Sequence, residues 1–301
     1  MMQRPPGAEA DAVAALAESL AVLLDAGLPP RSAWAVVAEH GGHPVAARVV
    51  ASLAAQTSCA AALGEAAQSD DVRALAAAWS VAEVAGTPLG HTLRVVAGAL
   101  RDVAEAERDG EVALSGPRAT ARLVAWLPAA GVILAVALGT DVVGAAASPA
   151  GATAVGAGVV LMFLGRWWMS ALLRRALARR PIPGLAEELI ALSLAGGASA
   201  AASVEAADRS VRSAGLPALD HRAARRILQV AESAGAPAVE LLTASARQVR
   251  RTARTDARRA AATLGVRLML PLGLCVLPSF LLLAVVPLAL SLLASTTAGL
   301  R

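Results

Sequence analysis

The chain has 301 residues, of which 56% are hydrophobic and 17% charged, and its formal net charge is only +4. Its mean hydropathy of +0.59 favours a membrane protein over a water-soluble globule. Only two cysteines occur, Cys59 and Cys275, which excludes a disulfide framework and a cysteine-based metal set. All 27 basic residues are arginine, and abundant alanine raises the helix propensity throughout.

Residues 10–118 are predicted to form a cytoplasmic helical domain. Apolar residues recur at helical spacing, and no strand-like alternation rises above that pattern. Gly27 and Pro30 interrupt the first helix, and further helices are expected over 44–64, 70–85 and 88–114. His40 and His43 flank a Gly-Gly turn. Because two histidines without further ligands do not make a metal site, they are interpreted as part of an exposed turn.

Three uncharged stretches, at residues 123–140, 142–165 and 268–300, predict membrane-spanning helices at residues 122–140, 151–173 and 266–294. Roughly 20 apolar residues in a helix cross the hydrocarbon core of a bilayer. Prolines inside these stretches are expected to kink the helices, which is tolerated where neighbouring helices satisfy the released backbone groups. These prolines are Pro128, Pro271, Pro278 and Pro287.

Arginines flank the predicted spans on one side of the membrane only. Arg118 and Arg122 precede the first span, four arginines between 174 and 180 follow the second, and an arginine-rich helix precedes the third. Since arginine near a span marks the cytoplasmic side, the amino terminus and residues 181–262 are predicted to be inside and the carboxyl terminus outside the plasma (inner) membrane. Trp167 and Trp168 suit an interfacial aromatic belt.

Residues 181–262 are predicted to be a second cytoplasmic helical domain that repeats the first. The segment Leu16-Ala-Glu-Ser-Leu20 matches Leu185-Ala-Glu-Glu-Leu189, 169 residues later. The segment Val81-Ala-Glu-Val-Ala-Gly-Thr-Pro88 matches Val230-Ala-Glu-Ser-Ala-Gly-Ala-Pro237, 149 residues later, so the second copy is 20 residues shorter between the landmarks. The two matches occur in the same order in both halves, which predicts two homologous helical bundles. Together with the three apolar stretches, they predict an all-α membrane protein with two such bundles and three spans.

No arrangement of residues typical of an enzyme occurs. The sequence lacks GxxxxGK[ST], HExxH and GxSxG, and its four histidines share no spacing with cysteines or carboxylates. The predicted spans hold no acid, lysine or histidine at mid-depth, which disfavours a transporter. The chain is predicted to act without catalysis, metal or cofactor, and a membrane-bound enzyme or permease with an unrecognised site is kept as the alternative.

An arginine stripe on one helical face is the sharpest local feature. Its members are Arg247, Arg250, Arg251, Arg254 and Arg258. One interpretation is a collar beside anionic lipid headgroups; the other is a protein interface. At the offset of 149 residues, Arg254 corresponds to Glu105. Its neighbours in the stripe, Arg251 and Arg258, correspond to Asp102 and Asp109. The two equivalent helices are therefore opposite in charge, and they are expected to face each other or to face partners of opposite charge. Nucleic acid is disfavoured because no aromatic residues interleave with the stripe.

Repeat-equivalent acids and turns form a second group of candidate interface residues. They are Glu83, Gly86, Pro88, Glu232, Gly235 and Pro237. Glu83 and Glu232 either mark docking surfaces or simply pair within their own bundles, as acids on helices usually do.

The order of these motifs resembles the type II secretion system F family, the inner-membrane platform proteins of type II secretion systems, type IV pili and Tad (Flp) pili. The resemblance implies two helical bundles, three spans, a secretion ATPase and pilin or pseudopilin subunits as partners, and contact with a second platform protein or another copy. The chain departs from many relatives in its short second domain and in having Ala85-Gly86 and Ala234-Gly235 where they carry a longer Gly-Glu-x-Ser-Gly element. The machine and the oligomeric state stay open.

Overall fold

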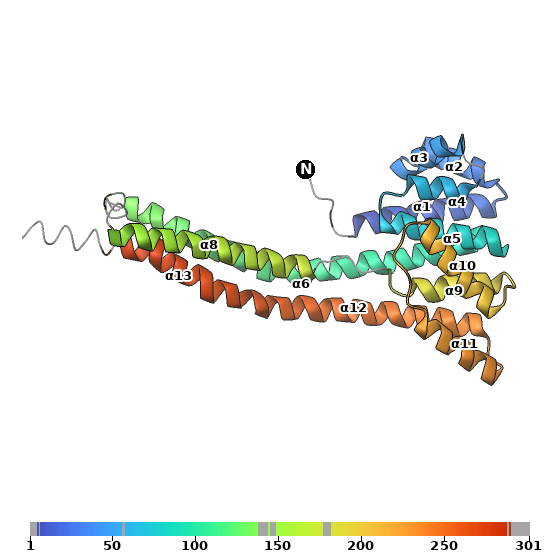
Figure 1. Cartoon of the computed structure of the whole chain (residues 1–301). Helices are drawn as coiled ribbons and strands as arrows, with labels where there is room; N and C mark the ends of the chain where they lie inside the picture. The colour runs from blue at the N-terminus through green and yellow to red at the C-terminus, as the bar shows by residue number, and fades with distance from the viewer. Residues whose placement is uncertain are drawn as a thin grey trace, which may run out of the picture. The chain divides into compact units, whose positions relative to one another are not determined.

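The computed structural model describes residues 5, 7–55, 58–137, 144, 149–176, 182–287 and 289. Every element in these ranges is a helix, as the sequence predicts, and none is a strand (Figure 1). The chain divides into two compact units. Unit 1 comprises Met1–Asp109 and Arg180–Ala257, and unit 2 comprises Gly110–Arg179 and Arg258–Arg301. Each unit therefore draws on both halves of the sequence.

Unit 1 consists of short helices and the first turns of two long ones. They are α1 (Ala8–Asp25), α2 (Pro30–His40), α3 (Pro44–Leu53), α4 (Cys59–Ala66), α5 (Asp70–Ala85), α6 (Leu89–Ala137), α9 (Leu185–Ala195), α10 (Ala200–Ser213), α11 (Arg222–Ala234) and α12 (Ala238–Pro271). Local signals set many of the ends. The Ser69 hydroxyl accepts the N–H of Val72 at the start of α5, and Gly86, at φ 70°, ends that helix.

Two predicted helices differ from the structure. The helix expected over 44–64 is two helices, because α3 ends at Leu53 and Ser58 caps a new start at α4. Apolar periodicity runs through both and hides the break, whereas the serine cap marks it. The helix expected over 88–114 is longer than predicted. Helix α6 continues to Ala137 and stays helical through Pro128.

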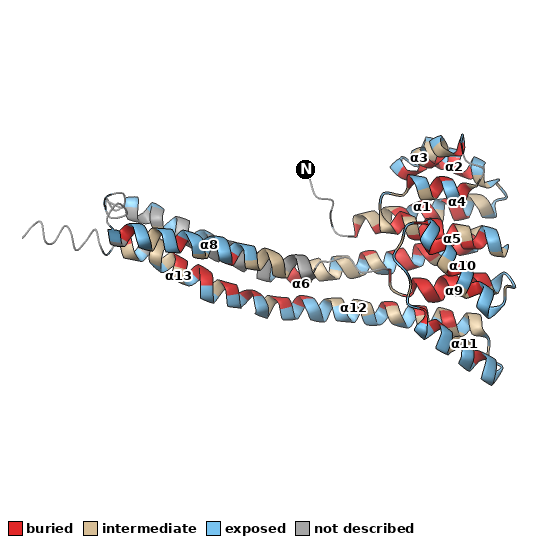
Figure 2. Cartoon of the chain, in the orientation of Figure 1, coloured by how far each residue is buried: buried red, intermediate tan, exposed pale blue. Residues whose placement is uncertain are grey.

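One hydrophobic core runs through unit 1 and takes side chains from both predicted helical domains (Figure 2). Helix α5 packs against α4, α9 and α10. Trp34 of α2 and Trp79 of α5 are fully buried, with ring centroids 5.7 Å apart. Alanines along α5 let the neighbouring helices approach closely. The division into domains at 10–118 and 181–262 stays a prediction, and helices from both ranges share this core.

Unit 2 contains α8 (Pro149–Ala176), the distal parts of α6 and α12, and then η1 (Leu272–Val276), α13 (Leu277–Phe280) and η2 (Leu281–Val285). Helix α8 packs against the last three of these. A Cβ added at Gly158 would lie 2.7 Å from Cγ of Leu283, and the Ser279 hydroxyl donates to the Gly158 carbonyl at 2.9 Å. Small residues thus allow the close helix contact that apolar surroundings favour.

The prolines near the end of α12 are accommodated by π-helical turns. Each turn ends two residues before a proline: η1 before Pro278 and η2 before Pro287. The N–H of Leu277 reaches back five residues to Leu272, and that of Val286 reaches Leu281. A proline ring clashes with the carbonyl four residues earlier, and the wider turn makes room for it. The sequence predicts kinks at these prolines, and the structure has widened helical turns before Pro278 and Pro287.

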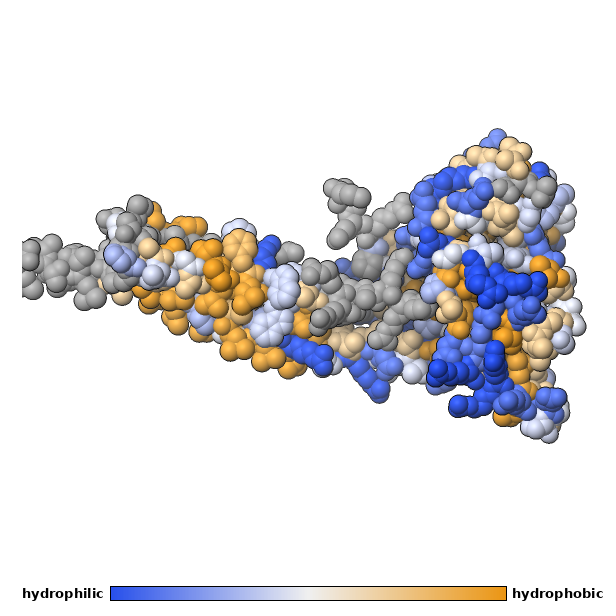
Figure 3. Space-filling model, viewed as in Figure 1, coloured by the Kyte–Doolittle hydropathy of each residue, from blue (hydrophilic) through white to orange (hydrophobic). Residues whose placement is uncertain are grey.

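Among the residues that the structure describes, two helices are long and apolar enough to cross a membrane. They lie at Gly151–Leu172, close to the predicted span 151–173, and within Ala238–Leu283, which overlaps the predicted span 266–294. Figure 3 shows apolar side chains gathered over α8 and α13 of unit 2. Residues 138–140 of the predicted span 122–140, and the end of the third from 290 on, lie outside the described residues. The count of three spans therefore stays a prediction.

Candidate partner interface

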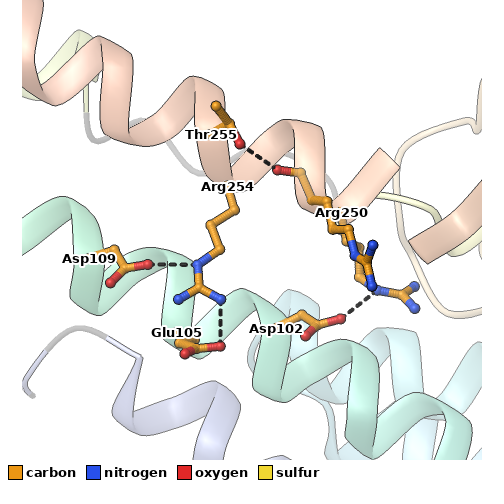
Figure 4. Close-up of polar contacts among 7 residues, drawn as sticks. Asp102, Glu105, Asp109, Arg250, Arg254 and Thr255 are labelled. Carbon is orange, nitrogen blue, oxygen red and sulfur yellow. Dashed lines mark hydrogen bonds and ion pairs between the residues drawn. The ribbon is translucent and has the colours of Figure 1, made fainter. Parts of the chain in front are cut away.

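The arginine face of α12 meets acids of α6 and α9 within unit 1. Arg250 donates through Nε to Oδ2 of Asp102 on α6 at 2.8 Å (Figure 4). It also donates through Nη1 to Oε1 of Glu188 on α9 at 2.8 Å. Only 8% of the Arg250 side chain is exposed. Its planar guanidinium presents several donors at once, so one side chain joins three helices.

One turn further along α12, Arg254 makes a second fork. Its Nε donates to Oδ2 of Asp109 at 2.7 Å, and its Nη1 donates to Oε2 of Glu105 at 2.8 Å. The two acids lie four residues apart on α6, so they share one face of that helix. The hydrogen bonds to Asp109 and then to Glu105 raise the pKa of Arg254 above its ordinary value. Arg254 is therefore held as a cation against α6.

Glu188 is the most enclosed member of this network. Its side chain is 4% exposed, and burial raises the pKa of its carboxyl, while the charge and hydrogen bond of Arg250 act in the opposite sense. Oε2 of Glu188 has no hydrogen-bond partner among the described residues. Arg250 is thus the chief group that stabilises the ionised carboxylate, and the pair depends on both members.

Helices α6 and α12 run parallel and in register where these pairs form. Asp102 meets Arg250, and Glu105 and Asp109 meet Arg254. Arg254 and Glu105 are separated by 149 residues, the offset of the predicted repeat. The acid and the arginine that correspond in the repeat therefore contact each other.

Two members of the stripe make contacts within the chain. Arg250 and Arg254 bind acids of α6 and α9, which favours a protein interface at these positions, and the choice between collar and interface stays a prediction. Arg247 and Arg251 are exposed. Arg258 is also exposed and belongs to unit 2. The stripe thus combines internal pairs with outward-facing cations.

A ladder of three further ion pairs, which the sequence interpretation missed, joins α1 to α6. Its pairs are Asp25 with Arg94, Glu18 with Arg101, and Asp11 with Arg108. Both series advance by seven residues in opposite directions, as expected for antiparallel helices. The heptad spacing of the three acids and the three arginines was the available signal. Helix α6 thus carries a basic face toward α1 and an acidic face toward α12.

The turn residues of the first half lie against the second half. Glu83 accepts hydrogen bonds from Ser58 Oγ and Trp79 Nε1, both at 2.8 Å, so it is used within its own bundle. Thr87, between Gly86 and Pro88, donates through its hydroxyl to the Leu192 carbonyl at 2.9 Å. This turn is therefore packed internally, although Gly86 and Pro88 remain exposed.

The equivalent turn of the second half is exposed. Gly235, at φ 61°, ends α11, and Glu232 and Pro237 on either side of it lie at the surface. The structure does not bring these three residues together with the arginine stripe in any described contact. They remain candidate interface residues, and their exposure is the one structural observation that supports this role.

The comparisons with known proteins place the first half in a family. Residues 16–137 match the family model described as type II secretion system (T2SS), protein F. The match begins in α1 and ends with α6. No curated protein and no solved structure matches the chain. Within the described residues, no group of three or more His, Cys, Asp or Glu side chains is arranged to hold a metal ion.

Proposed function

We propose that this chain, which belongs through residues 16–137 to the type II secretion system F family, is a multi-pass platform protein of a pilus-assembly or type II secretion machine. Members of the family work in inner-membrane secretion machinery, with ATPase and pilin-like partners in general. The two apolar helices long enough to span a bilayer support a membrane location. In this proposal the protein couples a cytoplasmic secretion ATPase to pilin or pseudopilin subunits.

The observation that carries the proposal is the paired continuity of α6 and α12. Helix α6 has 49 residues and α12 has 34, which at 1.5 Å per residue makes them about 74 Å and about 51 Å long. Arg250 and Arg254 tie the two together. A displacement imposed on the helices of unit 1 would pass along two connected rods into the apolar segments, where a pilin-like subunit is engaged.

We further propose that residues 10–118 and 181–262 are two copies of one helical domain. Arg101 binds Glu18 of α1, and Arg250, 149 residues later, binds Glu188 of α9. Both acids lie in the matched Leu-Ala-Glu-x-Leu segments, one position apart, since Glu18 corresponds to Glu187 and Glu188 corresponds to Ser19. The 20-residue difference falls where the first half has α3 and α4, since the second half has no described helix between α10 and α11.

The proposed topology has three spans, with the amino terminus inside and the carboxyl terminus outside. It is tested with single cysteines at positions 148 and 233 after Cys59 and Cys275 are replaced, because Ser233 is exposed and suits a labelling reagent. An impermeant thiol reagent applied to intact cells is expected to label position 148 and to leave 233 unlabelled. The reverse pattern refutes the topology.

The scaffold role is tested by retention of a secretion ATPase from the same organism. Full-length protein in nanodiscs is expected to retain that ATPase, and cells that lack the chain are expected to lose pilus assembly or secretion. The proposal includes no catalysis by the chain itself. Turnover of ATP or transport of a solute by the purified protein, without an added partner, supports the rival enzyme or permease instead. The identity of neighbouring genes distinguishes Tad pilus, type IV pilus and type II secretion machines.

A further inference from the structure

A basic groove lies between α6 and α12 on unit 1. It encloses about 450 Å³ and is open to solvent along its length. Arg94, Gly98 and Asp102 of α6 form one wall, and Arg247, Arg250, Arg251 and Arg254 of α12 form the other, with Glu188 between them. Five arginines and two acids line the groove, so its charge favours an anionic ligand.

Most of these arginines are already engaged. Arg94 binds Asp25, and Arg250 and Arg254 bind the acids of α6 and α9. The two that remain are Arg247 and Arg251, which are exposed and whose side chains form no hydrogen bond with another described residue, although the charge of Arg247 acts on Glu188. They are four residues apart and therefore neighbours on one face of α12. The internal pairs set the walls of the groove, and this pair of cations is left for a ligand.

The chemistry of the groove selects a peptide over other anions. An arginine fork binds a carboxylate through two parallel hydrogen bonds. The lining of the groove is mostly charged or polar, whereas small-molecule sites are lined predominantly by hydrophobic side chains. The groove also contains an acceptor beside its cations, since the Thr243 hydroxyl donates to the Val239 carbonyl and its oxygen can still accept a hydrogen bond. An extended acidic segment supplies carboxylates for the arginines and a backbone N–H donor for this oxygen, whereas a fully ionised phosphate offers acceptors alone.

We propose that this groove is the docking site for an acidic segment of a partner protein, with Arg247 and Arg251 as the residues that bind its carboxylates. The inference deepens the proposed function, because the secretion ATPase is the expected owner of that segment. Arg250 and Arg254 act as positioning residues, since they hold α6 and α12 at the separation that forms the groove.

The test measures binding of a fluorescein-labelled peptide of alternating glutamate and glycine to full-length protein in phosphatidylcholine nanodiscs. Arg247→Gln/Arg251→Gln is expected to weaken binding roughly ten-fold or more, because two charge-assisted contacts are lost. The matched control is Arg225→Gln/Arg226→Gln, which removes the same charge from exposed positions of α11. The control is expected to change the affinity less than about two-fold. Equal losses of peptide affinity in both double variants overturn the proposal, because they show that the effect comes from general surface charge.

A second variant blocks the groove without changing its charge. A Cβ at Gly98 meets no atom within 4 Å, so Gly98→Leu fills the groove without a clash and improves the helix propensity of α6. It is expected to abolish peptide binding, and unchanged binding overturns the proposal. Displacement of the peptide by phosphatidylglycerol vesicles, but not by phosphatidylcholine vesicles, identifies a lipid headgroup site and also overturns it.

The same variants separate this inference from the proposed function. If the ATPase is retained equally by wild type, Arg247→Gln/Arg251→Gln and Gly98→Leu, the groove is not its docking site, while the scaffold role stands. If the peptide binds the groove as described and the ATPase is not retained by wild type, the docking site stands and the partner assigned to it is wrong.

Discussion

The two halves of unit 1 each place an arginine against an acid on the first helix of that half. In the first half Arg101 binds Glu18, and in the second half Arg250, 149 residues later, binds Glu188. The first pair is 52% and 38% exposed, whereas the second is 8% and 4% exposed. A similar arginine–acid pairing thus lies in solvent in one half and inside the protein in the other, with the two acids one position apart in the matched segments.

The difference arises from what covers each pair. Arg250 lies under the contact between α6 and α12, where it also binds Asp102. Arg101 belongs to the α1–α6 ladder at the surface. Water screens an exposed pair and solvates either member when the other is removed, so such pairs contribute little. Water does not reach a buried pair, so removal of one member leaves the other as a charge with neither solvent nor a partner to stabilise it.

The largest expected effect comes from breaking the buried pair. Arg250→Met is expected to lower the free energy of unfolding by about 3–5 kcal/mol, because Glu188 stays buried without its cation. Denaturant titration of the full-length protein, followed by tryptophan fluorescence, measures the loss. Glu188→Leu/Arg250→Met is expected to recover most of it, since no lone charge remains. A double variant as unstable as Arg250→Met contradicts the comparison.

Lysine in place of the two forked arginines sharpens the comparison between internal pairs and a lipid collar. Arg250→Lys/Arg254→Lys keeps both charges, but a lysine cannot reproduce the planar fork that reaches two acids at once. Amide hydrogen exchange over residues 243–257 is expected to accelerate. Arg225→Lys/Arg226→Lys on the exposed face of α11 serves as the control and is expected to change nothing. Unaltered exchange in the first variant supports the collar interpretation.

The pH dependence of stability is expected to differ between the halves through Glu188. Burial raises the pKa of its carboxyl above the ordinary value near 4.5, so the folded state binds the proton more tightly than the unfolded state. The stability from this group is complete below the ordinary pKa and is lost as pH rises through the raised one. Wild type should therefore lose unfolding free energy relative to Glu188→Gln as pH rises from about 4.5. A parallel pH profile for both proteins contradicts the raised pKa, and Glu18→Gln provides the exposed control.

The smallest expected effect is at the exposed pair. Arg101→Ala is expected to leave the unfolding transition almost unchanged, because Glu18 regains water when its partner is removed. The same denaturant titration measures it beside Arg250→Met. A loss as large as that of Arg250→Met shows that the ladder between α1 and α6 is a main source of stability and removes the distinction between the halves.

Much of the fold follows from local signals that the sequence carries. Ser69 and Gly86 delimit α5, and apolar runs mark α8 and the end of α12 as apolar helices. The motifs around Leu16 and Val81 indicate the same family as the model that matches residues 16–137. The heptad series of the α1–α6 ladder is also present in the sequence, but the spacing on each helix alone does not show that the two helices pair.

The sequence by itself determined that the chain is helical, that it carries long apolar helices, and that α12 has an arginine face. These properties depend on residues within one helix or its ends, where spacing and capping act locally. Tertiary structure alone decided which arginines face inward: Arg250 lies against Glu188, 62 residues away, while Arg251 beside it stays exposed. It also decided that helices of both predicted domains share one core, and that π-helical turns precede Pro278 and Pro287. The reason is that burial and partner choice depend on the helices that pack around a residue, and those come from distant parts of the chain.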